Sequence, residues 1–158
     1  AGDDVLTQLA RLLQQIAREG DHVLRWGGEE FLILVRSVSA DKAMEVAERI
    51  RHAVAKQAFN AGVGRPLHLT CSIGVSIHPL WPAERQIADW SLTLELADAA
   101  LYRVKQEGRN GTVGLVAGPK LAEISLTSRD ADTVDTLVTD NALRWLQASG
   151  VGQLRIVH

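Results

Sequence analysis

Residues 25–31 read RWGGEEF, and they separate two apolar runs, HVLRW at 22–26 and FLILV at 31–35. Both runs are rich in branched and aromatic residues, and a glycine-containing turn joins them, which is the pattern of a β-hairpin. FLILV is apolar at every position, so we expect a strand that is covered on both faces. The hairpin is therefore predicted to lie inside a sheet and not at its margin.

The residues of the turn, Gly27, Gly28, Glu29 and Glu30, have two interpretations. Glycine tolerates positive φ, so a tight turn with solvated acids at its tip explains the tetrapeptide taken alone. In the second interpretation a bulky ligand such as a nucleotide lies directly on the glycine backbone. Successive strand residues point to opposite faces, so only one of the two carboxylates faces such a ligand. A carboxylate there suits Mg²⁺, which binds through a few carboxylates together with substrate phosphate oxygens.

Three amphipathic helices are predicted over 5–16, 41–54 and 92–106, because apolar residues recur there three and four positions apart. We expect an acidic residue to cap or open each of the first two helices and a glycine to end the third. These residues are Asp3 or Asp4, Asp41 and Gly108.

Two further strands are predicted in this part of the chain. One is LHLTCSIGVSIHP at 67–79, in which Gly74 marks a bulge or a place where another element packs close. The other is TVGLVA at 112–117. Helices on a largely antiparallel sheet are the simplest packing for this order of elements, so the predicted fold class is α+β, within the broad α/β group.

The character of the chain changes after residues 118–119. We therefore predict one domain over 1–117 and a C-terminal extension of unknown role over 118–158, which is short for an independent domain. Within the extension we expect a strand at 121–127, helical structure within 130–149 and a second strand at 152–158.

The composition excludes several classes of protein. Apolar residues make up 46% and charged residues 23%, which is typical of a globular chain and not of a disordered one. A formal net charge of −2 argues against sequence-independent binding to a nucleic-acid polymer. No apolar stretch is long enough to span a membrane and no signal peptide is recognised, so a cytoplasmic location is predicted. We expect the single Cys71 to be a small buried strand residue and not a reactive thiol.

Basic residues in two places have structural interpretations as well as functional ones. Lys105 in the last turn of a predicted helix and Arg109 just beyond it fit the helix dipole, and they fit a phosphate clamp equally well. Arg18 and Asp21, spaced RxxD ahead of the hairpin, fit a surface ion pair that contributes under about 1 kcal/mol. Neither pattern decides the function alone.

Six motifs, taken together and in order, resemble the GGDEF domain family, whose members are diguanylate cyclases. The resemblance covers residues 2–117. It implies an enzyme that condenses two GTP molecules into cyclic di-GMP and pyrophosphate with Mg²⁺ or Mn²⁺, on a five-stranded sheet wrapped by helices. Because each subunit would hold one GTP, it also implies a homodimer. The motifs are GDDVL at 2–6, RxxD at 18–21, RWGGEEFLILV at 25–35, AERIR at 47–51, LTCSIGVS at 69–76 and ADAALYRVKQEGRNG at 97–111.

The resemblance implies roles for the residues of the turn. Glu29 would be a metal ligand and the base for the attacking 3′-hydroxyl, and Glu30 would support the site. Gly27 and Gly28 would lie against the nucleotide. Asp3 would accept a hydrogen bond from the guanine edge.

The resemblance also assigns the charged residues elsewhere. Lys105 and Arg109 would contact the triphosphate of GTP. Cyclic di-GMP would bind at an inhibitory site away from the active site. The residues of that site would be Arg18, Asp21 and Arg49.

One part of the family pattern has no counterpart in these 158 residues. Family members carry, ahead of the first helix, a strand that ends in an Asp-rich segment and a helix with an Asn that reads guanine. The Asp supplies the other metal ligand. The alternative function is therefore a catalytically inactive domain that acts as a receptor for cyclic di-GMP, and a GTP-binding scaffold is a third.

Overall fold

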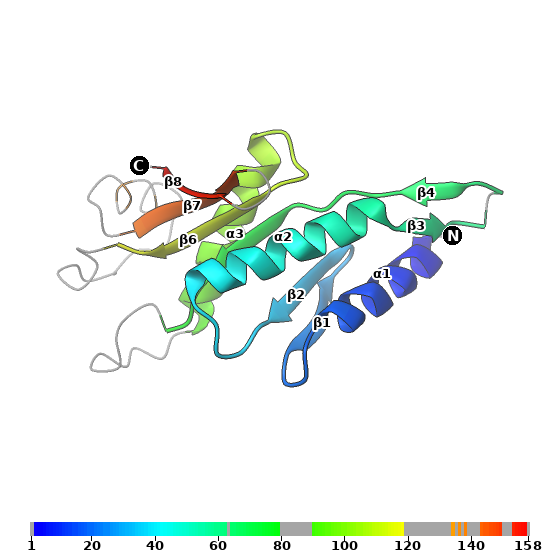
Figure 1. Ribbon diagram of the computed structural model, residues 1–158, viewed down its shortest axis with the longest axis horizontal. Helices are drawn as coiled ribbons and strands as arrows, with labels where there is room; N and C mark the ends of the chain where they lie inside the picture. The colour runs from blue at the N-terminus through cyan, green and yellow to red at the C-terminus, as the bar shows by residue number, and fades with distance from the viewer. Residues whose placement is uncertain are drawn as a thin grey trace.

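The computed structural model describes residues 2–62, 64–79, 90–118, 134, 136, 138, 143–149 and 153–157. Their arrangement is α+β, as predicted, and none of the described helices is both long and apolar enough to cross a membrane (Figure 1). The elements are α1 (Gly2–Ile16), β1 (His22–Gly27), β2 (Glu30–Leu34), α2 (Ala40–Lys56), β3 (Ala58–Asn60), β4 (Pro66–His68), β5 (Ile73–Ser76), α3 (Trp90–Gln106), β6 (Thr112–Ala117), β7 (Leu143–Ser149) and β8 (Gln153–Val157).

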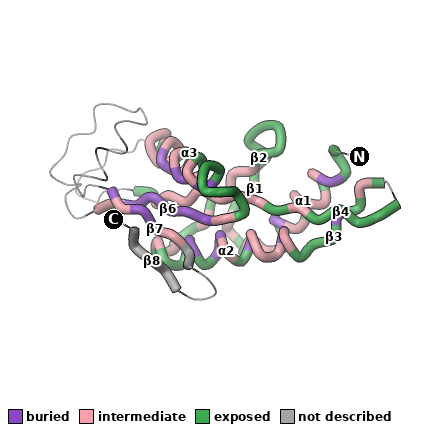
Figure 2. The backbone as a smooth tube through the Cα atoms, turned by 90° about the horizontal axis from the view of Figure 1, so that it is seen from above, coloured by how far each residue is buried: buried purple, intermediate pink, exposed green. Residues whose placement is uncertain are grey.

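The largest sheet has the strand order β5-β6-β7-β8, with one parallel pair followed by two antiparallel pairs. Helix α3 covers one face of it, where Leu96 lies in one buried cluster with Leu115 and Trp145. Helix α2 covers the other face, where Met44 packs with Leu146. Strand β6 is buried along most of its length, so it is the centre of the fold (Figure 2).

Strands β1 and β2 form the predicted antiparallel hairpin, joined by a turn at Gly28 and Glu29. Gly28 has φ +51°, a conformation that favours glycine, so the turn itself explains this residue. The inner face of the hairpin packs on a second buried cluster that α1 and α2 share. The hairpin residues on that face are Val23, Phe31 and Ile33.

The prediction that the hairpin lies inside a sheet is wrong for the described residues. Strand β2 pairs with β1 alone, and the side chains of Leu24 and Leu34 are 43% and 46% exposed. The run FLILV does alternate, with one set of side chains in the core and the other outward, because successive strand residues point to opposite faces. An apolar residue at every position of FLILV therefore does not show that another strand or helix covers the outer face of the hairpin.

The helix ends correct two predictions and confirm one. Helix α1 begins at Gly2, so Asp3 and Asp4 lie inside its first turn and do not cap it. The N-cap of α2 is Ser39, whose hydroxyl accepts a hydrogen bond from the Lys42 N–H at 3.3 Å. Asp41 lies in the first turn, where its charge still complements the helix dipole. Helix α3 ends at Gln106, and the predicted stop, Gly108, follows it with φ +107°.

The strand predicted over 67–79 is two strands, β4 and β5, in different sheets. Strand β4 pairs with β3, which the sequence analysis missed because glycines and a proline follow it. Leu69 and Cys71 lie between β4 and β5, and their side chains pack on the buried cluster that contains Phe59. Gly74 confirms the expected close approach, since a Cβ there would collide with the backbone of Ala97 and Leu101 in α3.

Strands β7 and β8 lie in the predicted extension. Strand β7 pairs with β6, and β8 pairs with β7. The helical interpretation is wrong for 143–149, because this segment is a strand with Leu143 and Trp145 against α3 and Leu146 toward α2. The strand expected at 152–158 is confirmed as β8. The strand expected at 121–127 lies outside the described residues.

Candidate functional site

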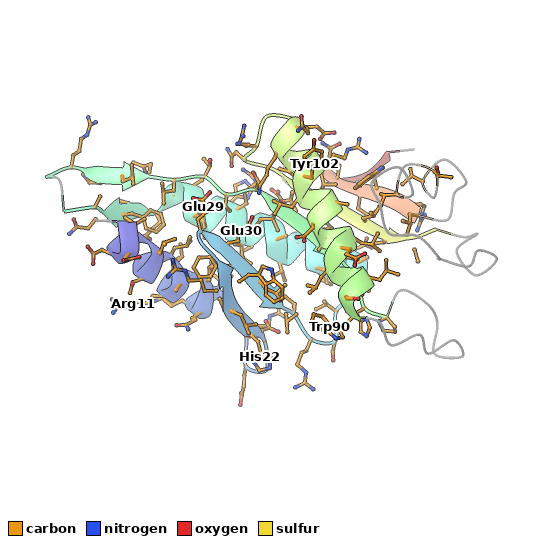
Figure 3. The ribbon with its side chains drawn as sticks, turned by 180° about the vertical axis from the view of Figure 1, so that it is seen from behind. Arg11, His22, Glu29, Glu30, Trp90 and Tyr102 are labelled. Carbon is orange, nitrogen blue, oxygen red and sulfur yellow. The ribbon has the colours of Figure 1, made fainter. Side chains whose placement is uncertain are left out.

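The turn of the hairpin is an exposed surface feature at one end of β1 and β2 (Figure 3). Arg25 Nε donates a hydrogen bond to the Gly28 carbonyl at 2.9 Å, which ties the turn to β1. Glu29 and Glu30 are both exposed, and Glu30 pairs in register with Gly27. The two carboxylates are therefore accessible to a ligand without any rearrangement of a core.

The two glycines differ in what the fold requires of them. Gly28 needs its positive φ for the turn. Gly27 does not have positive φ, and a Cβ built on it meets no other atom of the described chain within 4 Å. Gly27 lies at the irregularity in the β1–β2 register, but neither its φ nor the space at its Cβ position excludes a side chain.

The structure brings Lys105 to the turn across 75 residues of sequence. Its Nζ lies 3.4 Å from Glu30 Oε1, and the two side chains are 44% and 53% exposed. An exposed ion pair of this kind contributes under about 1 kcal/mol. The pair therefore holds the Lys105 cation beside the turn. An anionic ligand can replace Glu30 as the partner of Lys105 at little cost in free energy.

Arg109 does not join this group. It follows the end of α3 with φ +65°, and it lines a cavity of about 180 Å³ with Glu48, Arg51 and Gln147. No described residue of the hairpin lines that cavity. Asp3 is exposed in the first turn of α1. It makes no hydrogen bond or ion pair with the turn among the described residues.

Arg18 and Asp21 line the larger cavity, of about 440 Å³, together with Gln14, His22 and Leu34. The Asp21 carboxylate accepts hydrogen bonds from the backbone N–H of Arg18 at 3.0 Å and of Arg36 at 3.2 Å. The Arg18 N–H is the larger cause that holds the pKa of Asp21 below its ordinary value. Asp21 therefore stays ionised in mildly acidic solution and ties the end of α1 to the ends of both hairpin strands.

Arg49 lies elsewhere. It is exposed on α2, and it does not line the cavity that Arg18 and Asp21 share. The structure thus unites two of the three residues predicted for the inhibitory site.

The sequence analysis did not single out the half-buried pair Glu48 and Arg51 of α2. Arg51 donates to both oxygens of Glu48 through Nε and Nη2, and its Nη1 donates to Asn110 Oδ1 at 3.1 Å. Burial is the largest single influence and would raise the pKa of Glu48, but the hydrogen bonds and positive charges of Arg51 and its neighbours together outweigh it, so the pKa lies below its usual range. The spacing of three in AERIR was the signal, since residues three apart share a helix face.

Cys71 lies close to this pair and is not a strand residue, because β5 begins at Ile73. Burial raises the pKa of its thiol to about 11. The thiol is therefore protonated at neutral pH, which agrees with an unreactive cysteine.

No group of three or more Asp, Glu, His or Cys side chains that could hold a metal ion occurs among the described residues. The turn offers two carboxylates, which are the donors that a hard cation prefers. This donor set fits an ion that is held partly by the phosphates of a bound nucleotide.

Comparisons with known proteins identify the family to which this chain belongs. The family model described as "Diguanylate cyclase, GGDEF domain" matches residues 1–111. The diguanylate cyclase DgcM of Escherichia coli K12 is 44% identical over 109 residues, which are 69% of this chain and 24% of that protein. Treponema denticola diguanylate cyclase A is 39% identical, and the match covers 70% of this chain and 28% of that protein. The chain thus spans about a quarter of the length of the curated relatives it matches.

The solved structures it resembles include the diguanylate cyclase SiaD of Pseudomonas aeruginosa in complex with its activator SiaC. The TM-score is 0.62 at 38% identity, over 71% of this chain and 40% of that one.

Proposed function

Because this chain belongs to the GGDEF diguanylate cyclase family, we propose that it carries the nucleotide-binding turn of an enzyme that condenses two GTP molecules into cyclic di-GMP and pyrophosphate. The observation that carries the proposal is Gly27. Gly27 lies at the irregularity in the β1–β2 register, its φ is not positive, and the space at its Cβ position is open among the described residues, so the backbone there is accessible to a ligand. A nucleotide that lies on the backbone at the turn would use that access.

The charged groups around the turn fit the chemistry of the reaction. A 3′-hydroxyl that attacks an α-phosphorus must lose its proton, and an exposed carboxylate at Glu29 accepts it. The leaving pyrophosphate gains negative charge, and Lys105 beside Glu30 offsets that charge. Binding of the triphosphate exchanges the weak Lys105–Glu30 ion pair for a stronger contact with phosphate.

The proposal includes Mg²⁺ or Mn²⁺, held by Glu29 and the phosphates of GTP. A bound divalent cation would neutralise the negative charge that develops on the phosphate oxygens. Catalysis by two such turns, each with one GTP, requires two copies of the domain face to face. A homodimer is therefore part of the proposal.

The Gly27→Ala variant tests whether Gly27 leaves room for the nucleotide. We expect its thermal midpoint to match the wild type within about 2 °C, because the added Cβ has room and most such surface changes stay within about 0.5 kcal/mol. We expect KM for GTP to rise by at least about tenfold, because the Cβ separates the nucleotide from the backbone. Initial rates of cyclic di-GMP formation and a melting curve on the same sample measure both quantities.

The matched control is Gly2→Ala, another glycine at which a Cβ meets no described atom within 4 Å. It should change neither the melting curve nor KM. If Gly27→Ala lost stability instead of GTP affinity, the glycine would be a requirement of the hairpin and the ligand argument would fail.

A second candidate function is binding of cyclic di-GMP in the cavity that Arg18 and Asp21 line. The cavity combines a guanidinium with the apolar side chains of Leu24 and Leu34, a chemistry suited to a purine and its phosphate. One similar solved structure is a GGDEF domain of DgcB from Caulobacter crescentus in complex with c-di-GMP, with TM-score 0.57 and 25% identity over 71% of this chain and 63% of that one. Product inhibition and a receptor without catalysis both use this site.

Arg18→Ala is expected to weaken cyclic di-GMP binding by about ten- to a hundredfold, since a hydrogen bond from a charged group contributes roughly 1.5–3 kcal/mol. Calorimetric titration of the dinucleotide measures the loss. Arg11→Ala is the control, because Arg11 is an exposed arginine of α1, the helix just before Arg18, and it does not line the cavity. Equal affinities for the two variants would place the dinucleotide elsewhere.

A further inference from the structure

Four side chains join the C-terminal end of α3 to β7, and we call them the α3–β7 cluster: Arg103, Glu107, Trp145 and Gln147. Arg103 Nε donates to Glu107 Oε1 at 2.8 Å, and Gln147 Nε2 donates to Glu107 Oε2 at 3.3 Å. The guanidinium carbon of Arg103 lies 4.6 Å from the centre of the Trp145 ring, a cation–π distance. Each member thus contacts at least one other, and β7 contributes two of the four.

The β7 side of the cluster is firmly anchored. Trp145 is only 7% exposed, and it lies in the same buried cluster as Ala100 and Val104 of α3. In the sheet, Trp145 pairs with Leu115 and Gln147 pairs with Val113 of the central strand β6. The core therefore fixes the Trp145 end of the cluster, while Arg103 and Glu107 are 31% and 40% exposed.

On the opposite side of α3 the helix packs closely on β5 at Gly74, but the Lys105 side chain itself is held weakly. Lys105 lies two residues from both Arg103 and Glu107, which turns it by about 200° around the helix. Its contact there is the exposed ion pair with Glu30, which contributes under about 1 kcal/mol. A contact of that strength does not fix the end of a helix, so the α3–β7 cluster is the stronger of the two restraints on the last turn.

We propose that Trp145 and Gln147 are positioning residues, which hold the last turn of α3 so that Lys105 meets the triphosphate of GTP. The inference rests on the proposed function, because it assumes that GTP binds beside the hairpin turn. Misplacement of a binding group by about 1 Å is enough to cost on the order of a hundredfold in rate, so a restraint on this turn affects the reaction directly. Both residues lie beyond residues 1–111, which the family model matches.

The test uses Gln147→Glu in the full chain. This change places a second carboxylate against Glu107, whose Oε2 is 3.3 Å from the side-chain nitrogen of Gln147. We expect KM for GTP to rise about tenfold with kcat changed less, and amide hydrogen exchange over 103–109 to become faster. Calorimetric titration of GTP with Mg²⁺ gives the affinity without turnover.

Two further variants separate positioning from charge and from stability. The double variant Gln147→Glu/Glu107→Gln restores a donor and an acceptor with their places exchanged, and it should bring KM and hydrogen exchange back to within about threefold of the wild type. Gln106→Glu adds the same negative charge to an exposed position on the same helix end. It should leave the exchange unchanged and alter KM by less than about threefold.

The outcomes distinguish the inference from its premise. Wild-type KM, GTP affinity and exchange in Gln147→Glu would overturn the positioning role. An equal loss in Gln106→Glu would also overturn it, because added charge alone would then explain the effect. If the wild type binds GTP but forms no cyclic di-GMP, the cyclase proposal fails, while a loss of affinity in Gln147→Glu that the double variant recovers still supports the positioning role.

Discussion

Glu29→Gln is expected to lower the rate of cyclic di-GMP formation by at least about a hundredfold, the lower range for removal of a general base. The substitution keeps the size of the side chain and removes its charge and basicity. Glu29 is exposed in the turn, so we expect the melting temperature to stay within about 2 °C of the wild type. Product formation from GTP with Mg²⁺ or Mn²⁺, followed by chromatography, measures the rate.

Glu45→Gln is the matched control for this prediction. It removes one exposed carboxylate of α2, whose salt bridge with Lys42 is also exposed, and it lies outside the proposed site. Its rate should equal that of the wild type. A Glu29→Gln variant with more than about half of the wild-type rate would remove Glu29 from the chemistry, because a lost base costs far more than that.

Gly74→Ala is expected to destabilise the fold by about 3 kcal/mol or more, at the upper end of the range for overpacked cores. The added Cβ would collide with the carbonyl oxygen of Ala97 and the amide nitrogen of Leu101, and it would lie 2.9 Å from Leu101 Cβ. Backbone atoms of a helix cannot turn aside as the end of a flexible side chain can. Relief therefore requires α3 to move away from β5.

Urea unfolding followed by far-UV circular dichroism measures this loss, and the midpoint of thermal unfolding should fall by roughly 10 °C. Gly27→Ala is the control for stability, because the same added methyl group meets no described atom there. A Gly74→Ala variant as stable as Gly27→Ala would mean that α3 does not press on β5 as the structure has it. Because α3 carries Lys105, the same variant should also lose GTP turnover.

The sequence predicted the elements well where a local pattern decides them. Apolar spacing located α1, α2 and α3, and the glycine-containing turn located the hairpin. The prediction was less successful where pairing partners decide the structure. The segment 67–79 contains one continuous apolar pattern, yet β4 and β5 join different sheets, because β3 and β6 offer separate edges.

The predicted site shows the same division. Glu30 and Lys105 form an ion pair across the fold, and the Asp21 carboxylate accepts a hydrogen bond from the N–H of Arg18, three residues away. Arg109 and Arg49 lie apart from those pairs. Motif order along a chain identifies residues that a family shares, but a side chain's neighbours depend on how helices and strands pack.

The sequence by itself determined which family this chain belongs to and where α1, α2 and α3 lie, and it offered close packing at Gly74 as one of two alternatives. Those properties depend on residue types and on periods of two and 3.6 residues, which are local. Only the tertiary structure decided that Leu143–Ser149 is a strand, that Gln147 and Trp145 reach the end of α3, and that the space at the Cβ position of Gly27 is open among the described residues. These depend on contacts between segments far apart in the chain, and the free energy of such contacts is not a property of any one segment.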